Sequence, residues 1–180
     1  MDVVEALDLT FDNAQGVIAG VRADQLDDKT PCAEWTVREL LEHMIGVVAG
    51  MGAATRGEPR APFTLGADPA VQFADASAGT IAAWRAPGVL DRIIDGGPGP
   101  MPGRVLAGIN LLDTATHTWD VAVATGQPSA LPDAVATAAL EASQMIIQPE
   151  IRAGRFAPEI AAPAGATPTD QLVAFLGRTP

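Results

Sequence analysis

The fold is decided by the stretch LAGINLLDTATHTWDVAVATG, residues 106–126, within a helix that we expect over residues 102–126. Steps of three and four along this stretch keep side chains on one helix face. We expect an inward face made of Leu106, Ile109, Asp113, His117, Val121 and Ala124. Two of these residues are polar, and Asp113 and His117 stand about one helical turn apart. A buried carboxylate is costly unless a cation or several hydrogen-bond donors compensate it.

A second helix has its own start signal. Thr36 can cap it, and Glu39, three residues later, completes a capping box. Trp35, just before the cap, is spaced to form a hydrophobic staple with Leu40. His43 lies at the border of this helix's apolar face, three residues after Leu40. If the two helices are neighbours, His43 can approach Asp113 and His117, and the three side chains would offer a divalent metal three ligands with coordination positions left open.

Plainer interpretations of these residues stay open. A single histidine on an apolar face is more often a satisfied core residue than a metal ligand. Asp113 and His117 can also be a hydrogen-bonded pair that ties two helix turns together. In that case the three polar residues would fix the packing of a bundle and would bind no metal.

The remaining pattern indicates more helices and little else. We expect helices near residues 2–21, from Pro69 to just before Pro87, and from 132 to 148, and a short last helix that opens at Thr167. Residues 89–100 allow a short strand or hairpin. Five or six helices with connectors of moderate length favour an all-α bundle, which we expect to form a single domain over residues 1–180.

Composition excludes several classes of function. The chain has 22 acidic and 11 basic side chains, for a net charge of −11, which disfavours binding to nucleic acid or to an anionic membrane surface. Its start mixes acids with apolar residues, unlike a signal peptide, so we expect a cytoplasmic protein. The only cysteine is Cys32, so the chain can form no internal disulfide and no all-cysteine zinc site. We expect Cys32 to be a small buried residue rather than a reactive thiol.

Three blocks of the sequence resemble one known family. Residues 30–43, TPCAEWTVRELLEH, are similar to a TPCxxWxVRxLLxH signature, and residues 113–126, DTATHTWDVAVATG, to a DxxxHxWDxAxATG signature. The tail from Pro168 to Pro180 is similar to the family's ending. Over nearly its whole length the chain resembles the metal-binding proteins of the mycothiol-dependent maleylpyruvate isomerase N-terminal domain family, in the DinB/YfiT-like superfamily.

The resemblance implies a DinB/YfiT-like four-helix bundle, to which the residue pattern adds short helices and leaves a small β element open. It also implies a metal site at the matching positions, which are His43, Asp113 and His117. The isomerase branch usually has glutamate where this chain has Asp113, and it carries a further C-terminal domain for which this chain has little room, so we do not transfer the isomerase activity. Asp120, three residues after His117, is either a partner that orients the imidazole ring or a surface or capping acid.

Two classes of function are compatible with these residues. The first is an enzyme that uses a divalent metal, zinc in preference to nickel, manganese or iron, and a mycothiol-like thiol for isomerisation or S-transfer on a small electrophile. The same ligands would also serve a metal-bound water in hydrolysis. The second class is a non-catalytic module that binds a metal or a small ligand, which the shortage of further acid–base residues favours. The expected partner is a small-molecule substrate, and a homodimer is left open.

Overall fold

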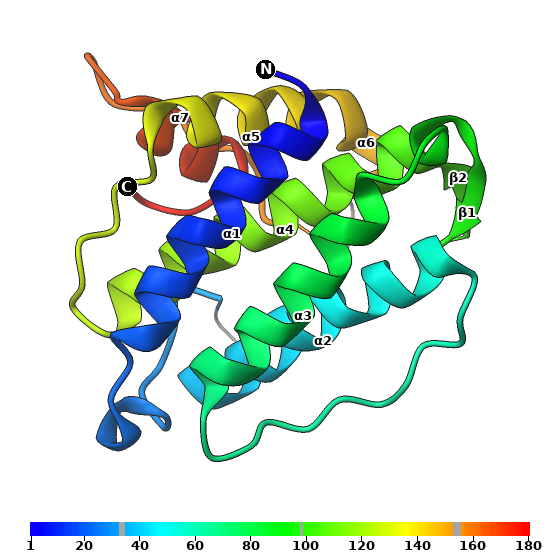
Figure 1. The fold of residues 1–180 in the computed structure, drawn as a ribbon. Helices are drawn as coiled ribbons and strands as arrows, with labels where there is room; N and C mark the ends of the chain where they lie inside the picture. Colours follow the sequence, from blue (N-terminus) through cyan, green and yellow to red (C-terminus); the bar gives the residue numbers. More distant parts are fainter. Residues whose placement is uncertain (33–34, 98, 153–155) are drawn as a thin grey trace.

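The computed structural model describes residues 1–32, 35–97, 99–152 and 156–180. Its core is a bundle of four helices, which are α1 (Val3–Ala19), α2 (Val37–Arg56), α3 (Pro69–Trp84) and α4 (Gly103–Ala124) (Figure 1). Helix α1 packs on α3 and α4, and α2 packs on the same two helices. The expected all-α four-helix bundle is confirmed, and α2 and α4, which carry the candidate site residues, are neighbours in it.

Shorter elements connect and cover the bundle. They are η1 (Ala23–Gln25), η2 (Val89–Asp91), β1 (Ile93–Asp95), β2 (Pro100–Pro102), α5 (Asp133–Ile146), α6 (Pro149–Arg152) and α7 (Pro168–Phe175). Strands β1 and β2 pair antiparallel just before α4, which realises the expected hairpin. Helix α5 packs on α4 and α1, and α7 packs on α5. The sequence did not predict η1, η2 or α6, because three or four residues are too few to show a period.

Side-chain caps fix where the helices begin. The Oγ1 atom of Thr36 accepts a hydrogen bond from the Glu39 amide at 3.4 Å, and a Glu39 carboxylate oxygen accepts one from the Thr36 amide at 2.8 Å. This capping box, expected from the sequence, sets the start of α2 at Val37. It therefore places His43 about two turns into the helix, on the side that faces α4.

Glycine lets α2 approach its neighbour closely. A Cβ atom at Gly52 would lie only 3.1 Å from the Cα atom of Thr80 in α3. The Thr80 hydroxyl in turn donates a 2.8 Å hydrogen bond to the carbonyl of Val48 in α2.

Among the described residues, no helix is long and apolar enough to cross a bilayer.

Helix α4 is enclosed on most of its surface, and this corrects the expectation of a single inward face. Buried residues occur on all of its sides, because α1, α2 and α5 contact it from different directions. Of the six residues expected to point inward, Leu106 and Val121 are buried and the others are half-buried, namely Ile109, Asp113, His117 and Ala124. Asp113 and His117 thus lie on a half-buried strip of a central helix and are not sealed within the core.

Candidate metal centre

His43 of α2 and Asp113 and His117 of α4 lie together at the edge of the bundle interior. The Nε2 atom of His43 is 3.1 Å from Oδ1 of Asp113, and the Nε2 atom of His117 is 3.7 Å from the same oxygen. One potential ligand atom from each of the three residues lies within 4.8 Å of the other two. Their side chains are 29%, 18% and 12% exposed respectively. The structure therefore brings together the three residues that the sequence singled out, and leaves them accessible from outside.

Asp113 has more hydrogen-bonding capacity than its neighbours use. Its Oδ2 atom is buried and has no hydrogen-bond partner among the described residues. Burial favours the neutral carboxyl, but the hydrogen bond to His43 and the nearby charges of His117 and His43 outweigh it and hold the pKa of Asp113 below its ordinary value. An ionised carboxylate with a buried, unpartnered oxygen is short of positive charge.

His117 is held from its other side by Asp120. The Nδ1 atom of His117 is 2.9 Å from Oδ2 of Asp120, whose side chain is fully buried. Burial would raise the pKa of Asp120, but its hydrogen bonds to Arg178 and His117 lower it further than burial raises it. Because an ionised carboxylate only accepts, the contact puts a proton on Nδ1, and in the neutral ring the lone pair of Nε2 then lies toward Asp113. Asp120 is therefore the partner that orients the ring, and the alternative of a surface acid is wrong.

This set of donor atoms suits a divalent metal. Imidazole nitrogen and carboxylate oxygen are common ligands of zinc and of other transition metals. The Nε2 lone pair of His117 and the oxygens of Asp113 are acceptors that converge, so a positive ion between them would satisfy both. A carboxylate behind the ring, as Asp120 is here, is the usual outer contact of a metal-binding histidine. Three such residues could hold an ion and leave positions open for water or substrate.

Trp35 covers the two imidazoles, a role that the sequence did not predict. Its ring centroid lies 4.5 Å from that of His43 and 5.9 Å from that of His117. We expected Trp35 only as the staple at the start of α2. The position just before the cap, about two turns from His43, was the available signal, but it gave no direction for the indole ring.

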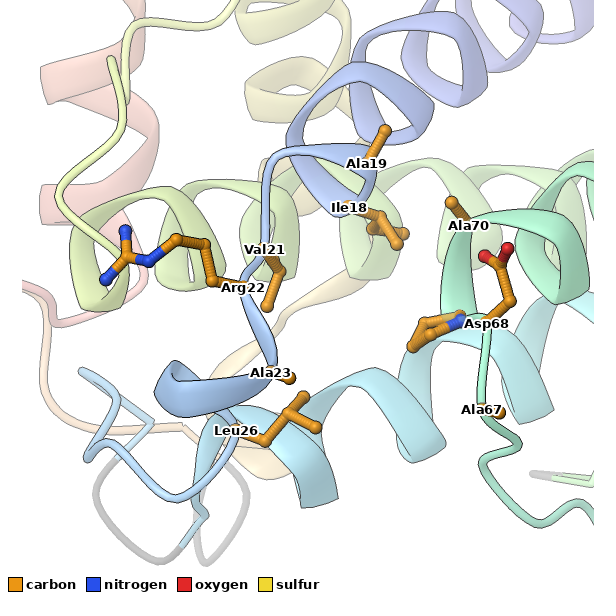
Figure 2. A pocket seen from close by; sticks show the side chains of 10 residues that line it. Ile18, Ala19, Val21, Arg22, Ala23, Leu26, Ala67, Asp68 and Ala70 are labelled. Atoms are coloured by element: carbon orange, nitrogen blue, oxygen red, sulfur yellow. The ribbon is translucent and has the colours of Figure 1, made fainter.

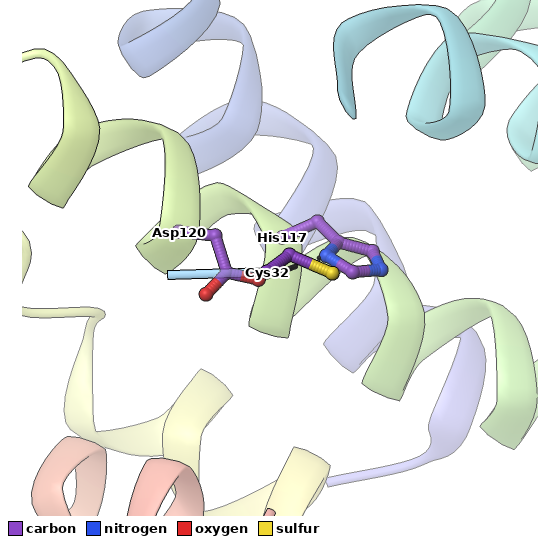
Figure 3. Close-up of side chains that lie close together, drawn as sticks. All are labelled: Cys32, His117 and Asp120. Carbon is purple, nitrogen blue, oxygen red and sulfur yellow. Dashed lines mark hydrogen bonds and ion pairs between the residues drawn. The ribbon is translucent and has the colours of Figure 1, made fainter. Parts of the chain in front are cut away.

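Cys32 lies on the Asp120 side of His117 (Figure 3). Cys32, His117 and Asp120 also place one potential ligand atom each within 4.8 Å of one another. Cys32 is half-buried, whereas we expected a buried residue. This second group is a poor cation site, because the guanidinium of Arg178 already binds both oxygens of Asp120, at 2.8 and 2.7 Å, and its charge repels a metal ion.

A pocket of about 230 Å³ opens beside His43. It is lined by residues of α2 and of the loop that follows α2, namely Glu42, His43, Gly46, Arg60, Ala61, Pro62 and Phe63. Arg60 contributes a positive charge to this wall and Phe63 an aromatic ring. Of the three candidate metal ligands, His43 lines this pocket, which therefore offers space for a small molecule beside one ligand.

A second pocket, of about 260 Å³, lies at the end of α1 (Figure 2). Its lining is largely aliphatic, with Ile18 and Leu26 among its residues. Its charged groups are already engaged, because Asp68 caps α3 and Arg22 pairs with Asp24. This pocket offers no group for chemistry, and we place the functional site at the histidines.

Comparison with known proteins agrees with the resemblance seen in the sequence. Residues 7–122 match the family model for the mycothiol maleylpyruvate isomerase N-terminal domain. Two uncharacterized proteins of Mycobacterium tuberculosis, from strains CDC 1551 and H37Rv, are each 41% identical over 184 residues, covering 99% of both chains. A crystal structure of the mycothiol-dependent maleylpyruvate isomerase aligns with a TM-score of 0.48 at 15% identity, covering 76% of this chain and 67% of that one. The chain belongs to the mycothiol maleylpyruvate isomerase N-terminal domain family.

Proposed function

We propose that this protein binds a divalent metal ion through His43, Asp113 and His117, and that it uses the ion in a reaction between a low-molecular-weight thiol and a small electrophile. The observation that carries the proposal is the state of Asp113. This carboxylate has a lowered pKa, two imidazoles converge on it, and one of its buried oxygens has no donor within the part of the chain that the structure describes. Zinc is the ion that we favour, because nitrogen and carboxylate ligands with an open position are typical of catalytic zinc.

The residues around the site have separate roles in this proposal. His43 and His117 would supply neutral nitrogen ligands, and Asp113 would supply a negative one. When bound, the metal would stabilise a thiolate at neutral pH and direct it at the electrophile. Asp120 keeps the proton of His117 on Nδ1, so that Nε2 stays available to the site. Trp35 shields the imidazoles from solvent on one side.

Two observations support a thiol and a small substrate. The description of the matched family names mycothiol, which is a low-molecular-weight thiol. The pocket has His43 in its wall, and its volume of about 230 Å³ suits a small molecule. Arg60 and Phe63 in its wall offer a cation and an aromatic ring to such a substrate. The reaction class that fits is isomerisation or S-transfer.

Metal content is the first test. Protein purified without chelator is compared with His43→Ala, His117→Ala and a control, Asp75→Ala, which removes an exposed carboxylate of α3. Elemental analysis should find one divalent ion per chain in the unchanged protein and in the control, and almost none in the two histidine variants. Equal metal in all four proteins would refute the proposed ligands.

Cobalt then separates the alternatives for the reaction. The Co²⁺-loaded protein is mixed with a thiol and examined for a sulfur-to-cobalt charge-transfer band, and turnover of a small electrophile is followed with and without the thiol. A band together with thiol-dependent turnover supports the proposal. Turnover without any need for thiol would indicate a hydrolase that uses metal-bound water, and binding without turnover would indicate a non-catalytic module.

A further inference from the structure

A buried ion pair ties the end of the chain to the central helix. The guanidinium of Arg178 donates through Nε to Oδ1 of Asp120 at 2.8 Å, and through a terminal nitrogen to Oδ2 at 2.7 Å. Asp120 is fully buried and the side chain of Arg178 is 13% exposed. Two parallel hydrogen bonds between charged groups give this pair a fixed geometry as well as a strong attraction.

The chain is shaped to deliver Arg178 to this position. Helix α7 ends at Phe175, and Gly177 follows with a φ of +80°, a left-handed conformation that side chains other than that of glycine rarely adopt. The Arg178 amide then donates to the carbonyl of Val173 at 2.9 Å, which closes the turn. A Cβ atom at Gly177 would lie 2.6 Å from the Cβ atom of Ala157, so the turn is also packed against the segment before α7.

Asp120 links Arg178 to His117 through hydrogen bonds. Its Oδ2 atom accepts from Arg178 and also from Nδ1 of His117, at 2.9 Å. Arg178 thus fixes the carboxylate, the carboxylate fixes the proton and plane of the imidazole, and the opposite ring nitrogen is aimed at Asp113. Outer contacts of this kind tune how strongly a histidine binds metal.

We propose that Arg178 is a positioning residue of the metal site, acting through Asp120 to hold His117 in the orientation and tautomer that ligation requires. The inference rests on the proposed function for its metal, but it concerns a residue outside residues 7–122, so the family match does not assign it. In consequence the C-terminal segment is part of the site, although it supplies no ligand.

Metal affinity measures this role. Metal-free protein, Arg178→Ala, Arg178→Lys and a control, Arg104→Ala, are titrated with Zn²⁺ in competition with a chromophoric chelator. Arg104 pairs with Asp91 on the surface, where both side chains are mostly exposed, so the control removes an arginine from an ion pair away from the site. We expect Arg178→Ala to bind zinc about 10–100-fold more weakly, as is typical when an outer contact of a ligand is lost. The zinc affinity of Arg178→Lys should lie between those of Arg178→Ala and the unchanged protein, because lysine cannot bind both oxygens in the same way. The control should bind zinc as tightly as the unchanged protein.

Chemical rescue separates positioning from general loss of structure. Millimolar guanidinium, far below denaturing concentrations, should restore part of the zinc affinity of Arg178→Ala and leave that of the unchanged protein as it was. Zinc affinity in Arg178→Ala equal to that of the unchanged protein would overturn the inference. If Arg178→Ala does not fold, full affinity in Arg178→Lys together with an unchanged tautomer of His117 would do the same.

The tautomer of His117 gives a readout that needs no metal. With only two histidines in the chain, ¹⁵N NMR of the rings can be assigned by comparison with His43→Ala. We expect His117 of the metal-free protein to carry its proton on Nδ1, and to exchange between tautomers in Arg178→Ala. If the unchanged protein bound no zinc, the proposed function would fail, while an Nδ1 proton that depends on Arg178 would still support the positioning role and one that does not would overturn it.

Discussion

The two sides of His117 differ in how completely their polar groups are satisfied. On the side that faces the C-terminal segment, each oxygen of Asp120 has a donor, because Arg178 binds both and His117 binds one. Toward α2, Asp113 has one oxygen near two imidazoles and another oxygen with no donor among the described residues. Both carboxylates stand on α4, about two turns apart. The difference therefore comes from what the neighbouring segments bring to each side.

This difference separates two kinds of polar group within one helix. On the Asp120 side the ion pair is complete without any bound ion, and breaking it leaves a buried charge unpaired. On the Asp113 side, a neutral His117 and the carboxylate are two acceptors that face each other, and only a positive ion or proton makes that favourable. Local deficits of this kind are expected where a protein binds something.

Removing the carboxylate of Asp120 should cost the most stability. Asp120→Ala leaves the guanidinium of Arg178 buried without its partner, so we expect the free energy of unfolding of metal-free protein to fall by about 3–5 kcal/mol. Urea unfolding measures the change. Asp91→Ala, which breaks the surface pair with Arg104, should cost less than about 1 kcal/mol. A cost for Asp120→Ala as small as that of the control would mean that the two sides are alike.

Removing the carboxylate of Asp113 should cost little stability and most of the zinc affinity. Asp113→Ala deletes one hydrogen bond to His43 but also an unsatisfied buried oxygen, so the unfolding free energy of metal-free protein should change by about 1 kcal/mol or less. Zinc affinity should fall by more than about 100-fold, which exceeds the effect expected from an outer contact. Chelator competition and urea unfolding give the two numbers. A large loss of stability with unchanged zinc affinity would assign Asp113 to packing.

Zinc should stabilise the fold only when Asp113 is present. Zinc at one hundred times its dissociation constant should raise the unfolding free energy of the unchanged protein by about 2.7 kcal/mol, because the unfolded chain lacks the assembled site. Thermal unfolding with zinc or with a chelator measures this gain. The gain should vanish in Asp113→Ala. An equal gain in that variant would place the bound zinc elsewhere.

The capping box of α2 is an exposed interaction, and we expect it to add only a small pH-dependent stability. The amide and hydroxyl of Thr36 lower the pKa of Glu39 below its ordinary value of 4.5. A carboxyl whose pKa is lower in the folded state adds stability above its ordinary pKa, and this stability is lost as the pH falls through the lower folded value. Unfolding midpoints of the unchanged protein should therefore drop slightly more below pH 4.5 than those of Glu39→Gln. Parallel pH curves would mean that the box adds no pH-dependent stability.

Much of the fold was predictable because its signals are local. The capping boxes at Thr36 and Thr167 and the proline that opens α3 each fix a helix start through contacts within one turn. The convergence of His43 with Asp113 and His117 was also within reach, since polar residues on two helix faces stand out against apolar neighbours. The inward face of α4 was not, because a helix with neighbours on several sides has no single apolar stripe.

The supporting residues of the site could not be predicted from spacing. Arg178 lies 58 residues beyond Asp120, and only the turn at Gly177 and the packing of α7 on α5 decide where its guanidinium ends. The ring of Trp35 and the half-buried position of Cys32 likewise depend on contacts with residues of α4 that lie far away in the sequence. Periodicity reports which face of an element is apolar, but it does not report which distant segment will cover that face.

The most direct test of the central claim is anomalous X-ray diffraction at the zinc edge from crystals of the zinc-loaded protein. We expect one peak about 2.0–2.2 Å from a nitrogen of His43, a nitrogen of His117 and an oxygen of Asp113. A zinc peak bound by Cys32 and Asp120, or no peak between the two histidines, would contradict it.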